Sequence, residues 1–168
     1  MIIHPQDRSA RAGIPLSTKR GTAIPNAQRL ERPHSALAAG VALWGTERPQ
    51  ARLRSVTSTY NCVAMVLACR RTWVDTEEIS LVLTEDGFRR LAGVGEAQRA
   101  DLELYRDAQG DLAHIGLVIS NTPDIETAGW DTMVLSKWGW DGEYYHPVDH
   151  VPQIYGRPAE YWSERQWS

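Results

Sequence analysis

Cys62 is the residue of this chain whose sequence surroundings best suit nucleophilic chemistry. It follows the polar run Thr57-Ser58-Thr59-Tyr60-Asn61 and precedes the apolar run Val63-Ala64-Met65-Val66-Leu67. Hydroxyl and amide side chains are typical helix N-caps, so the sequence predicts a helix over residues 61–71 with Cys62 in its first turn. The peptide dipoles at a helix N-terminus favour a thiolate, which is the nucleophilic form of cysteine.

A histidine, His114, opens the apolar segment 114–119, which is typical of a strand. A cysteine on a helix and a histidine on a distant strand predict a thiol-hydrolase dyad, with Cys62 as nucleophile and His114 as base. If strands 114–119 and 133–138 pair, Ser136 falls near His114 and would orient its imidazole as the third catalytic residue. Because the register cannot be read from the sequence, other residues stay open for this role: Asp111, Glu143 and His146.

Each member of the dyad also has an ordinary structural interpretation. A cysteine at the start of an amphipathic helix is usually core, and a histidine that opens a strand is usually a satisfied polar residue. Cys69 lies seven residues after Cys62, and two helical turns span roughly 10 Å, too far for a disulfide. The sequence therefore predicts two free thiols, which suits a reducing compartment.

Length and composition narrow the class of protein. A chain of 168 residues fits one domain with a substantial core. The net charge of −3 argues against nucleic acid as a partner, and no apolar run is long enough for a membrane span. The start of the chain lacks the apolar stretch of a signal peptide. We therefore expect a protein of the cytoplasm, or one delivered into another cell without a standard signal peptide.

The charge is unevenly distributed along the chain. Residues 1–50 carry seven Lys and Arg against three Asp and Glu, whereas residues 51–168 carry eleven against eighteen. We interpret residues 1–50 as a basic, Pro- and Arg-rich arm, extended or partly disordered, that either lies across the acidic body or contacts an anionic protein partner. Within it, residues 35–44 form an apolar island that can dock as a helix. The folded domain is predicted to span residues 51–168.

The domain reads as helices followed by strands. Helices are expected over residues 61–71 and 75–83, with a short helical turn in 84–91. Alternation in Leu102-Glu103-Leu104-Tyr105-Arg106 predicts a strand that pairs with 114–119 across the turn 107–110. The remaining elements are a loop over 121–130, a strand over 133–138 and a last strand over 159–162. Helices followed by strands indicate an α+β fold.

Aromatic side chains gather after residue 129, and we expect some of them to form a binding wall for a peptide or another extended substrate. These residues are Trp130, Trp138, Trp140, Tyr144 and Tyr145. His146, Asp149 and His150 lie close together in the sequence, but their spacing matches no recognised zinc pattern. We therefore predict no metal ion and no cofactor.

Several short motifs occur in an order that resembles a known group. They are Tyr60-Asn61-Cys62-Val63-Ala64, Gly110-Asp111-Leu112-Ala113-His114, Ser136-Lys137-Trp138-Gly139, Glu143-Tyr144-Tyr145-His146-Pro147 and Tyr155-Gly156. The series resembles a poorly characterised group of bacterial domains that look like relatives of the papain-like and NlpC-type cysteine peptidases and amidases. The resemblance covers residues 57–163.

The resemblance implies a papain-like α+β fold with the Cys62 helix packed on a small antiparallel sheet. It also implies Cys62 as nucleophile and His114 as base, with Ser136 near the place of the third residue, where papain-like enzymes keep asparagine and NlpC-type enzymes often have histidine. No glutamine precedes Cys62 in the papain manner. Asn61, Tyr60 or the Cys62 N–H would then form the oxyanion hole, with Trp138 beside the substrate.

These observations predict a thiol hydrolase, a cysteine peptidase or amidase, or a related acyl transferase. Its substrate would be a peptide or protein, cut at a peptide or isopeptide amide bond. The alternative is a catalytically inactive papain-like scaffold that serves as a protein-binding module.

Overall fold

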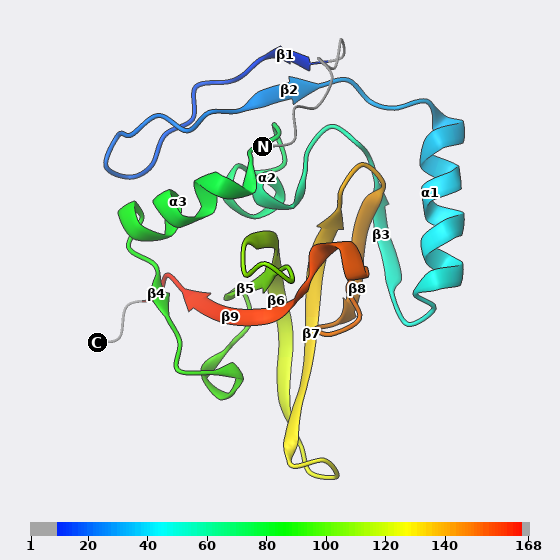
Figure 1. The fold of residues 1–168 in the computed structure, drawn as a ribbon, viewed down its shortest axis with the longest axis vertical. Coiled ribbons are helices and arrows are strands. Elements are labelled where there is room, and N and C mark those ends of the chain that lie inside the picture. The colour runs from blue at the N-terminus through cyan, green and yellow to red at the C-terminus, as the bar shows by residue number, and fades with distance from the viewer. Residues whose placement is uncertain (1–9, 166–168) are drawn as a thin grey trace.

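The second half of the chain builds most of one large antiparallel sheet. In the computed structural model, which describes residues 10–165, β5 (Leu102–Arg106), β6 (Leu112–Asp124), β7 (Gly129–Trp138) and β8 (Gly142–Pro147) pair in succession. β9 (Arg157–Ser163) returns to the other side of β5. β3 (Arg52–Val56) and β4 (Arg89–Arg90) form the two edges, so the order is β3-β8-β7-β6-β5-β9-β4 (Figure 1).

This architecture corrects the predicted fold class. The expected papain-like α+β arrangement, with N-terminal helices and the Cys62 helix on a small sheet, is wrong. The described chain is mostly β, with a seven-stranded sheet, a separate two-stranded sheet and a few short helices. The expectation failed because the strands β3 and β8 are too polar to be recognised as strands from the sequence, and they widen the sheet.

One face of the sheet packs against the short helices, and we call it the helix face. Leu104 of β5 pairs with Ile115 of β6, and Leu135 of β7 pairs with Leu117 of β6; Leu104, Ile115 and Leu135 belong to the main apolar core. The core continues into α2 (Cys62–Leu67) and α3 (Ile79–Glu85), with α3 preceded by the 3-10 turn η1 (Thr76–Glu78). Because side chains alternate along a strand, the neighbouring residues of these strands point to the other side.

The opposite face carries Tyr105, His114 and Ser136, which alternate with the core residues of β5, β6 and β7. It is covered in part by α1 (His34–Glu47), whose Trp44 makes an edge-to-face contact with Trp138. The 3-10 turn η3 (Gln153–Tyr155) covers His114 by stacking Tyr155 on its ring. Aromatic side chains therefore cover much of this face.

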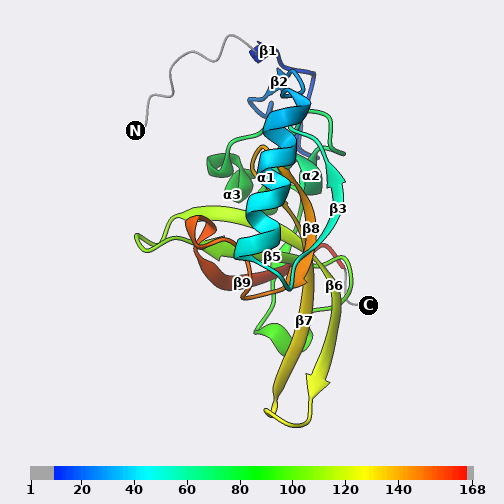
Figure 2. The ribbon, with the colours of Figure 1, turned by 90° about the vertical axis from the view of Figure 1, so that its right-hand side faces the viewer.

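The N-terminal segment is built into the fold from residue 10 onward, and the first nine residues of the predicted arm lie outside the described part. β1 (Ala10–Ala12) and β2 (Ala27–Arg29) form the two-stranded sheet beyond α2 and α3 (Figure 1). Ile24 is buried in the main core, and a backbone bridge joins Ala27 to Trp73. The predicted docking helix is confirmed as α1, which lies beside β3 (Figures 1 and 2).

Several predicted elements are confirmed and others are corrected. The hairpin of residues 102–106 with 114–119 is confirmed by the β5–β6 pairing, and the strands near 133–138 and 159–162 are β7 and β9. The helix predicted over 61–71 ends at Leu67, because Cys69 and Arg70 adopt positive φ angles. The helical turn predicted in 84–91 is replaced by β4.

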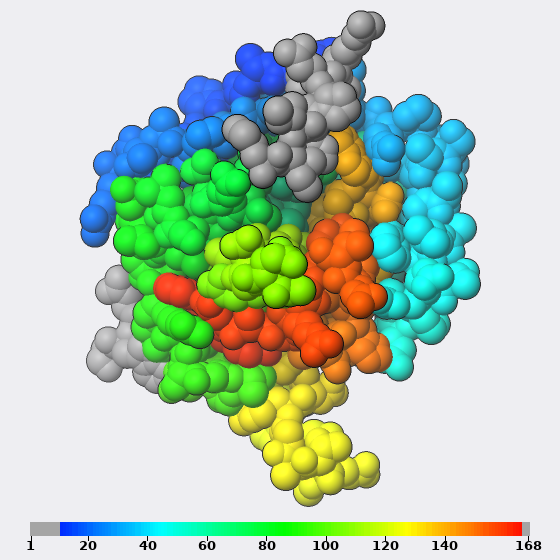
Figure 3. Space-filling view, in the orientation of Figure 1, coloured from blue at the N-terminus to red at the C-terminus, as the bar shows by residue number. Residues whose placement is uncertain are grey.

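The loop predicted over 121–130 is mostly the outer part of the β6–β7 hairpin. The two strands stay paired as far as Asp124 and Gly129. This hairpin extends away from the rest of the molecule in both ribbon views and forms a protrusion in the space-filling view (Figures 1, 2 and 3). Among residues 10–165, no helix combines the length and the apolar character that a membrane span needs.

Candidate functional site

Cys62 is the first residue of α2, as the sequence predicts. The Asn61 side chain caps the helix, because its Oδ1 accepts a hydrogen bond from Ala64 N at 3.1 Å. The same amide donates to Val74 O at 2.6 Å and so ties the helix start to the next segment. Cys62 is therefore held in a fixed position, with only 6% of its surface exposed.

Burial makes the Cys62 thiol hard to ionise in this conformation, which is the reverse of the expected activation. Burial raises the pKa of Cys62 to about 11, outweighing the backbone N–H of Ile115, that of Val63 and the Lys137 ammonium, which all act to lower it. The N–H groups of Cys62 and Val63 in the first turn of α2 are among these opposing influences, but burial outweighs them. Cys69, in contrast, is exposed.

His114 is fully buried, and neither of its ring nitrogens has a hydrogen-bond partner among the described residues. Its ring stacks on Tyr155 at 4.3 Å between centroids and lies 5.4 Å from the ring of Tyr105. Burial, and to a smaller extent His146 and Lys137, hold the pKa of His114 well below its usual value. The imidazole is therefore neutral at physiological pH.

The structure does not join Cys62 to His114. Cys62 and Ile115, the residue after His114 in β6, both belong to the main core, and the backbone N–H of Ile115 bonds the Cys62 sulfur. Since neighbouring residues of a strand point to opposite faces, His114 lies on the face opposite to α2. The expected thiol–imidazole hydrogen bond is accordingly absent. The separation depends on which alternate residues of β6 face α2, and this cannot be read from the local sequence pattern.

Ser136 lies on the same sheet face as His114, as expected, but it contacts a different histidine. Its hydroxyl lies 2.8 Å from Nε2 of His146 and accepts a hydrogen bond from Nε1 of Trp138 at 2.9 Å. The Pro147 carbonyl, 2.7 Å from Nδ1 of His146, can only accept, so Nδ1 carries the proton. Burial lowers the pKa of His146 to about 4, so Nε2 is unprotonated and accepts from Ser136.

This chain of hydrogen bonds is a satisfied internal network. Ser136, Trp138 and His146 are all buried, and Trp138 stacks on Tyr144 at 4.1 Å. Trp138, expected beside the substrate, is enclosed in the structure. His146, one of the residues left open as an orienting group, contacts Ser136 rather than His114.

Tyr60 and Glu143 form a second buried network on the helix face. The Tyr60 hydroxyl donates to Glu143 Oε1 at 2.7 Å, Arg70 Nε donates to the same oxygen at 2.5 Å, and Arg54 donates to Oε2. Glu143 is therefore engaged and does not orient His114. Tyr60, expected in the oxyanion hole, instead fixes this carboxylate. Asp111, the remaining alternative, lies at the exposed β5–β6 turn.

The basic group on the same face as Cys62 is Lys137, which sequence reasoning missed. Lys137 pairs with Glu143 across β7 and β8 and alternates with Ser136, so it points to the helix face. Its Nζ donates to Gly139 O at 2.5 Å and lies 5.6 Å from the centre of the Tyr60 ring. The sequence did carry a sign of this: Lys137 lies two residues after the core residue Leu135, so both side chains point to the same face of the strand.

Lys137 is an unusual lysine because its side chain is fully buried. Burial lowers its pKa to about 8, against the opposing influence of Asp141, Cys62, Glu143 and Glu31. Lys137 and Cys62 each affect the pKa of the other. A lysine with a pKa close to neutral can accept a proton at physiological pH, which an ordinary lysine cannot.

The aromatic residues expected to form a substrate wall are spread through the molecule. Trp140 pairs with Trp73 at 4.3 Å and holds Arg29 of β2, Tyr145 packs against the main core, and Trp130 lies on the outer β6–β7 hairpin. Within residues 10–165, no three His, Cys, Asp or Glu side chains gather as a metal site would need.

The comparisons with protein-family models, with curated proteins and with solved structures find no match to this chain. The chemistry of the site is therefore the basis for any functional assignment.

Proposed function

We propose that the chain is a thiol-dependent hydrolase or acyl transferase that acts on amide bonds, with Cys62 as nucleophile and Lys137 as its proton acceptor. The observation that carries this proposal is the buried lysine on the same sheet face as the cysteine at the start of α2. Burying an amine costs folding free energy, and a functional role would account for such a residue. Strongly shifted titratable groups are also typical of functional sites.

The chemistry follows from the groups around the thiol. The Lys137 amine takes the proton of Cys62, and the thiolate attacks the carbonyl carbon of the amide. The N–H groups that lower the pKa of Cys62, above all that of Ile115, stabilise negative charge near the sulfur. The Lys137 ammonium then returns the proton to the leaving nitrogen, which gives a thioester. Water completes hydrolysis, or an amine completes transfer.

The described conformation is the closed state of this site. Burial is the influence that raises the pKa of Cys62, while the neighbouring N–H groups and Lys137 act in the opposite direction. Access of solvent to the sulfur would remove the first influence and leave the others. Opening alone would therefore favour the thiolate.

The test is alkylation of Cys62 by iodoacetamide at pH 8, followed by peptide mass spectrometry on the intact chain. Lys137→Met should slow labelling of Cys62 several-fold, because the proton acceptor is gone. His114→Gln should leave the rate unchanged, because His114 lies on the other face. Exposed Cys69 serves as the internal standard. Equal rates in wild type and Lys137→Met, or slowing by His114→Gln alone, would exclude Lys137 as the partner of the thiol.

Catalysis itself is tested with peptide vinyl sulfones, electrophiles that trap a catalytic thiolate. The proposal expects a covalent adduct on Cys62, absent in Lys137→Met, with Cys69 unmodified. If Cys69 is modified and Cys62 never is, the chain is not a thiol enzyme. That outcome would favour the second candidate, a protein-binding module, which the burial of Cys62 supports.

A further inference from the structure

The outer part of the β6–β7 hairpin is a two-stranded ribbon that extends beyond the other strands of the sheet (Figure 1). The last pair between β5 and β6 involves Leu117, and the last pair between β7 and β8 involves Met133. From Met133 outward, residues 120–124 of β6 and 129–133 of β7 pair with each other as far as Asp124 and Gly129. A two-stranded ribbon is marginally stable alone, so an extended one needs support.

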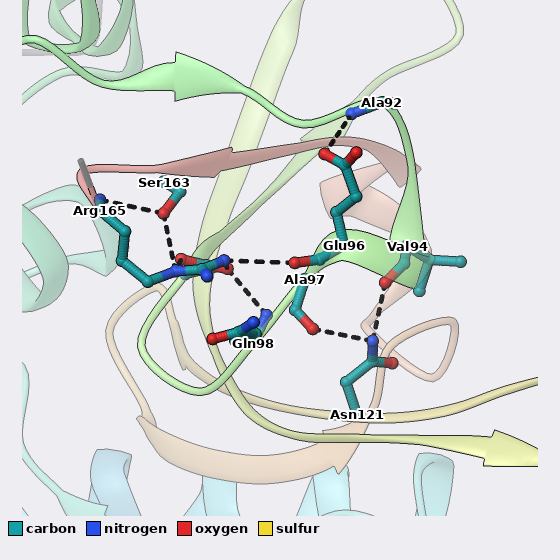
Figure 4. Close-up of polar contacts among 9 residues, drawn as sticks. Ala92, Val94, Glu96, Ala97, Gln98, Asn121, Ser163 and Arg165 are labelled. Atoms are coloured by element: carbon teal, nitrogen blue, oxygen red, sulfur yellow. Dashed lines mark hydrogen bonds and ion pairs between the residues drawn. The ribbon is translucent and has the colours of Figure 1, made fainter. Parts of the chain in front are cut away.

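That support comes from the segment around η2 (Val94–Glu96). The Asn121 amide donates to Val94 O at 2.7 Å and to Ala97 O at 3.0 Å (Figure 4). Its carbonyl oxygen accepts from the Thr132 hydroxyl at 2.6 Å, which ties the two strands together at the same level. The ribbon is therefore held firmly at its base and presents its outer end in a fixed position.

The outer end is apolar and acidic at once. Ile125 is 95% exposed and Trp130 is 39% exposed. Residues 119–132 contain Asp124, Glu126 and Asp131 but no Lys or Arg. All three carboxylates line a groove of about 540 Å³ together with Ile125 and Trp130. Asp124 also holds the turn by accepting from Glu126 N and from the Thr127 hydroxyl, whereas Glu126 and Asp131 are exposed.

We propose that this groove, lined by Asp124, Ile125, Glu126, Trp130 and Asp131, is a docking site for a positively charged protein segment that carries an apolar side chain. Ile125 and Trp130 together give the groove an exposed apolar part, and tryptophan is enriched among the residues that anchor protein interfaces. The carboxylates around it select a basic partner and speed its association. The same charge repels nucleic acids and anionic membranes. The inference is independent of the thiol chemistry.

The test is a selection of random twelve-residue peptides displayed on phage against the intact chain. The proposal expects enriched peptides to be rich in Lys and Arg and to contain a large apolar residue. Synthetic copies should bind about tenfold or more weakly to Ile125→Ser, since burying such a side chain is worth about 1.5–3 kcal/mol. Asp131→Lys should also weaken binding. Ile154→Ser, which changes another exposed isoleucine (72% exposed), should have no effect.

Other results would overturn the proposal. Enriched peptides that are acidic or neutral, or that bind Ile125→Ser as well as wild type, would exclude a basic segment as the occupant. A dimer in sedimentation that Ile125→Ser dissociates would identify a second copy of the chain instead. Binding to anionic phosphatidylserine vesicles that requires Ile125 would identify a membrane surface.

Discussion

Replacing Lys137 by methionine should stabilise the folded protein at neutral pH. The pKa of Lys137 falls from the usual 10.5 to about 8, with burial as the main cause. One pKa unit corresponds to about 1.4 kcal/mol, so the folded state disfavours the charged lysine by about 3 kcal/mol. Methionine removes this cost but leaves Gly139 O without its partner, a loss of about 1 kcal/mol. We expect a net gain of about 2 kcal/mol at pH 7.

The stability difference between Lys137→Met and wild type should depend on pH. The folded-state pKa lies below the unfolded one, so the unfolded chain binds more protons between about pH 8 and 10.5. Wild type therefore gains stability as the pH rises through this window, and the advantage of Lys137→Met should shrink. Urea unfolding at pH 7, 9 and 10 measures it.

Lys19, the only other lysine of the chain, provides the matched control. Its side chain is 61% exposed, so Lys19→Met should change stability by less than about 0.5 kcal/mol at each pH. If Lys137→Met is less stable than wild type at pH 7, or if its advantage is the same at pH 7 and pH 10, the buried charge is not what weakens the fold. Lys137 would then act through packing.

Three further predictions concern backbone geometry and the second buried network. Gly156→Ala should destabilise the fold by about 3 kcal/mol or more, because φ is 81° and an added Cβ would overlap the Arg106 carbonyl. Gly87→Ala, at φ 80° in open space, should cost only about 1 kcal/mol in the same urea titration. Ala128→Gly should raise the melting temperature slightly, by relieving a left-handed residue (φ 54°) at the hairpin end. Glu143→Gln should cost about 1–3 kcal/mol, because it leaves two partly exposed arginines and the Tyr60 hydroxyl with a neutral partner. Hydrogen bonds from those arginines and Tyr60 outweigh burial and lower the pKa of Glu143. In wild type, the stability that the ionised Glu143 provides should therefore be lost as the pH falls through its folded-state pKa. Urea unfolding at a series of acidic pH values measures this loss.

The local pattern of the sequence predicted the central hairpin well. Alternation in 102–106 and the turn before His114 are short-range signals, and the β5–β6 pairing confirms both. The edges of the sheet left no such signal. β3 reads as Arg-Leu-Arg-Ser-Val, and β8 buries Glu143 and His146 because distant residues satisfy them. Polar residues in a buried strand become favourable only through long-range partners, so a local pattern does not identify them.

In the candidate site, too, the features set by adjacent residues were predicted and those set by distant residues were not. Cys62 at the start of a capped helix was predicted from adjacent residues, and the structure places it there. The partner of Cys62 depends on which residues of β6 and β7 face the helix. A shift of one residue exchanges His114 for Ile115 and Ser136 for Lys137. This phase is set by packing of the whole sheet, so sequence reasoning chose the histidine while the structure presents the lysine.

The strand order has a consequence for how the chain is synthesised. The two edge strands, β3 and β4, precede the other five strands of the large sheet in the chain, but their hydrogen-bonding partners are β8 and β9, which come later. During translation, from the N-terminus onward, β3 therefore has no partner until β8 is made, and β4 has none until β9 is made. Folding dominated by such distant pairings is slow. The nascent protein has a long period in which chaperones, or its own neighbours, can reach its unpaired strands.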